Sequence, residues 1–229
     1  DLKTDRVVGM EALLRWYDPE LGQMPPDRFI PFAEECGLIN DIGVWVLHKA
    51  CAQVCAWNKT FHSNLSVAVN ISPIHISTPG FVEMVRDVIE GTKINPHLLE
   101  IEITEMSMLD YTEDLIDTIE QLRALGITIA LDDFGTGYSS LNYLKKFPVD
   151  VLKIDRAFVR DILPEKTGIA MISAMISLAH ALNLQVVAEG VEEEAELNVL
   201  REHGCDFVQG YYFSKPLSVK DFTTTILNQ

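Results

Sequence analysis

Short apolar runs of strand length alternate with helical patterns along the whole chain, and this alternation restricts the possible folds more than any other feature. It favours a parallel β-sheet with right-handed crossovers. Seven runs qualify as strands, and most carry polar side chains at or near their ends: Glu11, Asn70, Glu102, Asp132, Asp133, Lys153, Glu189 and Gln209. An open sheet concentrates its site at one switch point, whereas a barrel gathers one residue from each strand around its rim. The distribution therefore predicts an α/β barrel that lacks one strand at its N-terminus.

The run from Ile127 to Ser140 is the clearest of these strand ends. Apolar, β-prone residues lead into Asp132 and Asp133, and a loop with two glycines follows. Adjacent carboxylates repel each other unless a cation lies between them or one takes up a proton. Alone, the Asp-Asp pair is more often an ordinary polar turn. Because further acids arrive from other strands, we expect a divalent metal ion here.

Length, hydrophobic content and net charge restrict the number of domains and the kinds of molecule that this chain can bind. The chain has 229 residues and is 48% hydrophobic, which suits one large core, and we expect a single domain over residues 1–229. Its 18 basic and 34 acidic residues give a net charge of −16, which argues against nonspecific binding to DNA, RNA or an anionic membrane surface. A small anionic ligand fits only if metal ions reverse the local charge.

The cysteines and the hydropathy pattern indicate a reducing compartment. The four cysteines show no Cys-x-x-Cys spacing, so buried thiols in the cytoplasm are expected and a zinc site is not. No signal peptide or membrane-spanning run is found in the sequence. The chain opens in mid-pattern, so an anchor or another domain upstream remains an open alternative.

Seven ordered motifs resemble those of one protein family. They are Glu11-Ala-Leu-Leu-Arg15-Trp16, Asn70-Ile-Ser72, Glu102-Ile-Thr-Glu105, the Asp132 to Ser140 segment, Lys153-Ile-Asp155, Ala188-Glu-Gly-Val-Glu192 and Gln209-Gly-Tyr-Tyr-Phe213. In these motifs the chain resembles the EAL-domain phosphodiesterases, which hydrolyse the bacterial second messenger cyclic di-GMP. The resemblance implies a modified (β/α)8 TIM-like barrel with one antiparallel strand. The family's first strand, which supplies a ligand-facing glutamine, is missing from this sequence.

The resemblance also implies a metal-dependent hydrolytic site. It assigns Glu11, Asn70, Glu102 and Asp132 to one Mg²⁺ or Mn²⁺ ion, with Asp132 bridging to a second ion beside Asp133 and Glu189. Two such ions suit in-line attack of water on a phosphodiester, here opening cyclic di-GMP to linear pGpG. The assigned catalytic residues are Glu11, Glu189 as general base, and Lys153 as a group that positions water or neutralises phosphate charge.

Other residues receive supporting roles from the same resemblance. Arg15 is expected to pair with a phosphate oxygen, and Asp155 and Gln209 to contact the ligand. Glu105 is expected to hold the loop from Phe134 to Ser140 in place. Family members also imply a homodimer and an upstream sensory or GGDEF domain, which makes this chain the C-terminal part of a larger signalling protein.

Each assignment has an ordinary structural alternative. Lys153 can be a strand-end residue whose ammonium reaches solvent, Asn70 a turn former, and Arg15 a partner for Asp18. Two other functions also stay open: an inactive receptor that binds cyclic di-GMP, and an unrelated metal-dependent barrel lyase. The filled metal positions and the intact glycine loop favour the hydrolase.

Overall fold

The computed structural model describes the chain except for residues 109–111, 137–143, 164–165 and 228–229. The chain forms two compact units. The first unit contains Asp1–Val8, Thr104–Tyr111 and Thr128–Gln229, and the second contains Gly9–Ile103 and Thr112–Ile127. The expectation of one domain over residues 1–229 stays a prediction.

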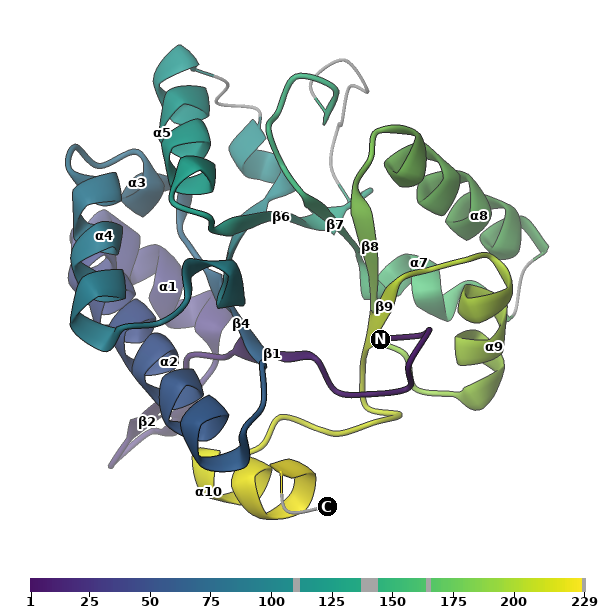
Figure 1. Cartoon of the computed structure of the whole chain (residues 1–229), viewed down its shortest axis with the longest axis horizontal. Coiled ribbons are helices and arrows are strands. Elements are labelled where there is room, and N and C mark those ends of the chain that lie inside the picture. The colour runs from purple at the N-terminus through teal and green to yellow at the C-terminus, as the bar shows by residue number, and fades with distance from the viewer. Residues whose placement is uncertain (109–111, 137–143, 164–165, 228–229) are drawn as a thin grey trace. The chain divides into compact units, whose positions relative to one another are not determined.

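The second unit is built on three parallel strands, β1 (Gly9–Ala12), β4 (Ser66–Asn70) and β5 (Leu99–Thr104) (Figure 1). In their register Glu11 lies opposite Ala68, and Asn70 lies opposite Glu102. The strand that carries Glu11 thus runs parallel to its neighbour. Antiparallel pairing occurs in a separate ribbon of β2 (Trp16–Asp18) and β3 (Gly22–Met24).

Helices α1 (Pro26–Glu35), α2 (Ile39–Phe61), α3 (Pro73–Ile76), α4 (Phe81–Thr92) and α5 (Glu113–Ala124) and the short turn η1 (Pro96–Leu98) complete this unit. The ends of α5 follow from the residues at its termini. Thr112 accepts a hydrogen bond from the Leu115 N–H, and Gly126 follows the helix with φ of +93°. Its apolar stripe is buried at Leu115, Ile119 and Leu122.

The first unit contains four further parallel strands, β6 (Thr128–Phe134), β7 (Val151–Ile154), β8 (Gln185–Glu189) and β9 (Phe207–Gln209). Its helical elements are η2 (Glu105–Met108), α7 (Arg156–Arg160), α8 (Lys166–Ala181), α9 (Glu194–Glu202), α10 (Val219–Phe222) and η3 (Thr223–Leu227). Apolar residues of the strands, such as Ile129, Leu152 and Val186, are fully buried. Parallel strands covered on both faces have this composition. Because β6, β7 and β8 run parallel, their carboxyl ends lie at the same edge of the sheet.

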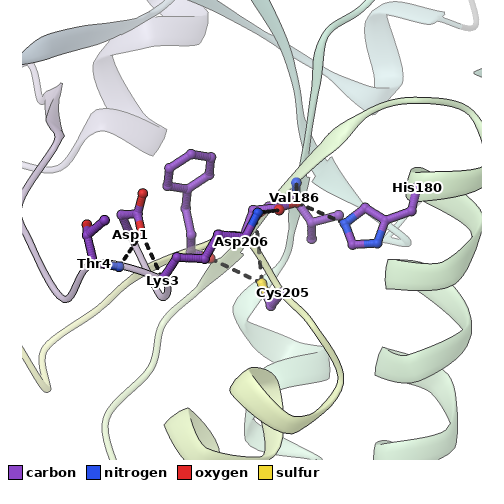
Figure 2. A network of polar contacts seen from close by, with 8 residues as sticks. Asp1, Lys3, Thr4, His180, Val186, Cys205 and Asp206 are labelled. Atoms are coloured by element: carbon purple, nitrogen blue, oxygen red, sulfur yellow. Dashed lines mark hydrogen bonds and ion pairs between the residues drawn. The ribbon is translucent and has the colours of Figure 1, made fainter.

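The opposite edge of this unit is held by Asp206, just before β9 (Figure 2). Its carboxylate accepts a hydrogen bond from the Val186 N–H at 3.0 Å, lies 2.9 Å from His180 Nε2 and pairs with Lys3 at 3.5 Å. Its carbonyl oxygen accepts a bond from the Leu2 N–H. Burial alone raises the pKa of Asp206, but the bonds from His180 and Val186 and the nearby charges bring that pKa below its usual value.

In the described part of the chain, we find no helix that is both long and apolar enough to span a bilayer.

Candidate functional site

Three carboxylates converge at the edge where β6 and β8 end. Oxygen atoms of Asp132, Asp133 and Glu189 all lie within 4.8 Å of one another. Asp132 is buried and Asp133 is exposed. Such a set of oxygen donors suits a hard divalent cation, which binds carboxylates in preference to softer ligands. The residues present therefore fit the metal ion that the sequence predicts.

An irregularity in β6 brings both aspartates to the same place. Successive residues of a regular strand point to opposite faces. Here the pairing of β6 with β7 shifts register between Leu131 and Phe134, and Asp133 adopts a left-handed conformation with φ of +56°. The Asp133 N–H donates to Asp132 Oδ1 at 2.9 Å. A left-handed residue other than glycine is uncommon, and such strain is typical of functional sites.

Lys153 lies within this cluster. Its Nζ is 2.8 Å from Glu189 Oε1 and 3.2 Å from Asp132 Oδ1, and its side chain is only 2% exposed. An ammonium that reached solvent would be exposed, so that alternative for Lys153 is wrong. The lysine places a positive charge between two acids that would otherwise repel each other.

The loop after β6 is held at its first glycine. Glu105 is buried, and its Oε2 accepts a hydrogen bond of 2.7 Å from the Gly135 N–H. Gly135 has φ of +101°, and a Cβ there would lie 2.5 Å from the Phe158 ring and 3.0 Å from Met175. The backbone therefore requires glycine at this position. Residues 137–140 of the predicted loop lie outside the described residues.

The second unit carries the other predicted metal ligands. Asn70 Nδ2 donates to Glu11 Oε1 at 2.6 Å, and this bond directs the amide nitrogen toward the carboxylate. Asn70 Oδ1 remains as the atom of this side chain that can bind a cation. Glu102, opposite Asn70 in the register, is 1% exposed. Within this unit Asn70 therefore contacts Glu11 and is the register partner of Glu102.

The structure places the predicted ligand-contacting residues as follows. Arg15 is exposed and donates to the Leu14 carbonyl oxygen. Asp18 instead accepts bonds from the N–H groups of Glu20 and Leu21, which lower its pKa. Gln209 lies opposite Glu189 at the end of β9. Asp155 accepts a bond from the Ala157 N–H and so caps α7, a structural role that its position after β7 already explains.

A family model and two curated relatives resemble this chain over most of its length. The family model described as EAL domain matches residues 1–216. The chain is 40% identical over 220 residues to the bifunctional diguanylate cyclase/cyclic di-GMP phosphodiesterase MucR of Pseudomonas aeruginosa, covering 96% of this chain and 32% of that protein. It is 42% identical over 216 residues to the cyclic di-GMP phosphodiesterase NbdA of the same species, covering 94% of this chain and 28% of that protein.

A solved structure described as the MucR phosphodiesterase in complex with c-di-GMP resembles this chain with a TM-score of 0.88 at 40% identity. The match covers 94% of this chain and 87% of that one, and it confirms the predicted fold class. The chain spans less than a third of the length of the two curated relatives described above.

Proposed function

Since the chain belongs to the EAL domain family, we propose that it is a phosphodiesterase that hydrolyses cyclic di-GMP with the help of divalent metal ions. The observation that carries this proposal is the cluster of Asp132, Asp133 and Glu189, in which Asp132 and Glu189 pair with the buried ammonium of Lys153. The names of MucR and NbdA, which share about two residues in five with this chain, support the same substrate.

The proposed reaction is in-line attack of water on one phosphorus of the ring. A new P–O bond forms to the water oxygen, one ring P–O bond breaks, and the leaving oxygen takes up a proton. The product is linear pGpG. We assign Glu11, Asn70, Glu102 and Asp132 to one Mg²⁺ or Mn²⁺ ion, and Asp132, Asp133 and Glu189 to a second. Ions in such a set supply activation of water and stabilisation of the attacking and leaving oxygens.

The side chains of the first unit then have distinct tasks. Glu189 accepts the proton of the attacking water, because its carboxylate stands at the strand end among the proposed ligands. Lys153 holds Glu189 and Asp132 in place and neutralises charge that develops on the phosphate. Glu105 fixes the backbone at Gly135, beside the two aspartates.

The remaining assignments concern the ligand. The exposed Arg15 pairs with a phosphate oxygen, for which its planar fork is suited. Gln209, at the end of β9 beside Glu189, contacts the ligand. Asp155 is also assigned a contact with the ligand. This contact is secondary in the proposal, because the Asp155 side chain already caps α7.

The test is to incubate the protein with cyclic di-GMP and Mn²⁺ or Mg²⁺ and to measure pGpG by chromatography. We expect product that disappears with a chelator. Glu189→Gln should lower kcat by at least about a hundredfold, the range for loss of a general base. Glu194→Gln, an exposed acid of α9, is the matched control and should leave turnover unchanged.

The outcomes separate the alternatives. Binding of cyclic di-GMP without product over hours would identify an inactive receptor. Neither binding nor product would contradict cyclic di-GMP as the substrate.

We further propose that the chain acts as a homodimer in the cytoplasm, within a longer protein that carries an upstream sensory or GGDEF domain. Relatives that are more than three times as long as the matched region support the longer protein. Specific activity that stays flat across a dilution series would count against control by dimerisation.

A further inference from the structure

A glutamate outside the proposed ligand set occupies an unfavourable place in the fold. Glu34 lies in the last turn of α1, where the helix dipole disfavours negative charge. That turn contains Glu35 as well and no basic residue, in a chain of net charge −16. Residues that break a local rule without local compensation are expected at functional sites.

The side chain of Glu34 reaches the segment that follows β4. Its Oε1 accepts a hydrogen bond from Ser72 Oγ at 2.6 Å, and both side chains are partly buried. A short hydrogen bond to a carboxylate is among the stronger ones in proteins. Glu34 therefore fixes Ser72 although the two residues are 38 positions apart in the sequence.

Ser72 in turn sets the path of the chain just after Asn70. Its Oγ accepts a bond from the Ile74 N–H and caps α3, and the intervening Ile71 N–H donates to the Glu102 carbonyl oxygen at 2.9 Å. Asn70 therefore lies between the β-ladder and the segment that the bond from Ser72 to Glu34 holds in place. From this position the Asn70 amide donates to Glu11.

We propose that Glu34 is a positioning residue for the metal site, acting through Ser72 on Asn70. This inference rests on the proposed function, which makes Asn70 a metal ligand. Partners of this kind, which orient a ligand without touching the ion, typically change metal affinity by about ten- to a hundredfold when removed. The expected signature is weaker metal binding with little change in turnover at saturating metal.

The test compares Glu34→Ala with Glu35→Ala, its exposed neighbour on the same helix. Glu34→Ala should raise the Mn²⁺ concentration for half-maximal activity about tenfold, with kcat at saturating Mn²⁺ within about twofold of the parent. Glu35→Ala should change neither. Glu34→Gln keeps an oxygen that accepts the Ser72 bond, so it should recover most of the affinity and guards against a misfolded alanine variant.

Two further measurements distinguish a failure of the role of Glu34 from a failure of the proposed hydrolase. In the Ser72→Ala background, Glu34→Ala should have no additional effect, because the two act through one bond; full additivity would overturn the proposal. Mn²⁺ binding measured directly by electron paramagnetic resonance needs no turnover. A loss of affinity in Glu34→Ala without any hydrolysis by the parent would support the positioning role and refute the hydrolase. Equal Mn²⁺ affinity of Glu34→Ala and Glu35→Ala would overturn the role of Glu34 alone.

Discussion

At the scale of single residues, the site combines groups that are unfavourable in isolation. Lys153 is buried at 2% exposure, and the carboxylates around it stand close enough to repel one another. A buried ammonium is stable only where opposite charges meet it, and removing one partner of such a pair is strongly destabilising. Lys153 and the acids therefore stabilise each other, and a divalent ion bound by the acids would take over part of that compensation.

Replacing Lys153 with methionine tests this compensation. We expect the metal-free variant to lose about 3 kcal/mol of unfolding free energy, because Asp132 and Glu189 lose their shared cation. Activity should fall by about a hundredfold or more. Since a bound ion restores positive charge, Mn²⁺ should raise the thermal midpoint of Lys153→Met more than that of the parent. An equal Mn²⁺ shift in both proteins would show that the lysine does not balance the acids.

At the scale of elements, the local residue pattern accounts for the strands and for the ends of the helices. The parallel strands around Asn70, Glu102, Asp132 and Glu189 and the capped helix α5 follow from apolar periodicity and helix-terminal residues. The register shift in β6 and the left-handed Asp133 were not predicted, because they depend on how β6 pairs with β7 and leave no pattern in the residues themselves.

Two other site features also escaped prediction. The bond from Ser72 to Glu34 joins distant segments, and only the acidic last turn of α1 hinted at it. The tight packing of Gly135 against Phe158 depends on tertiary contacts of α7. The motifs of the sequence predict candidate site residues, whereas the contacts that orient them required the fold.

The glycine at the start of the loop gives a prediction at this scale. Gly135→Ala places a Cβ against Phe158 and Met175 and adds the cost of a positive φ. Gly204 has φ of +77° with nothing within 4 Å of an added Cβ, so Gly204→Ala isolates the backbone cost. We expect about 1–2 kcal/mol for Gly204→Ala and about 1–3 kcal/mol more for Gly135→Ala, from urea unfolding. Equal losses would mean that α7 and α8 do not restrain the loop.

Helix α3 carries a buried histidine, which gives a prediction of pH dependence. His75 packs edge-on against Phe81, and a Cβ at Gly43 would collide with its ring. Burial lowers the pKa of His75 below 6.5. The folded state therefore keeps the ring neutral while the unfolded chain takes up a proton, so stability is full above pH 6.5 and falls as the pH drops below it.

Urea unfolding at pH 7.5 and pH 5.5 measures this effect. The loss due to His75 should stay below about 1.4 kcal/mol per pH unit, the limit for one proton. His75→Gln should remove that share of the pH dependence, and His62→Gln, at an exposed position, should leave it intact. An unchanged pH dependence in His75→Gln would exclude the buried ring as its source.

At the scale of the whole molecule, the acids assigned to the site are spread from Glu11 to Glu189 along a chain of net charge −16. Within the first unit Asp132, Asp133 and Glu189 meet, and within the second Asn70 meets Glu11. The proposed function assigns the group of the second unit to one ion and the group of the first unit to another, with Asp132 as the ligand that both ions share. Divalent cations would neutralise part of this negative charge and allow an anionic phosphodiester to approach.

The most direct test of this account is an anomalous-difference map from crystals grown with Mn²⁺. We expect Mn²⁺ within ligand distance of Asp132, with Glu11, Asn70 and Glu102 around one ion and Asp133 and Glu189 beside a second. A map whose Mn²⁺ peaks lie away from Asp132, in crystals saturated with the ion, would contradict it.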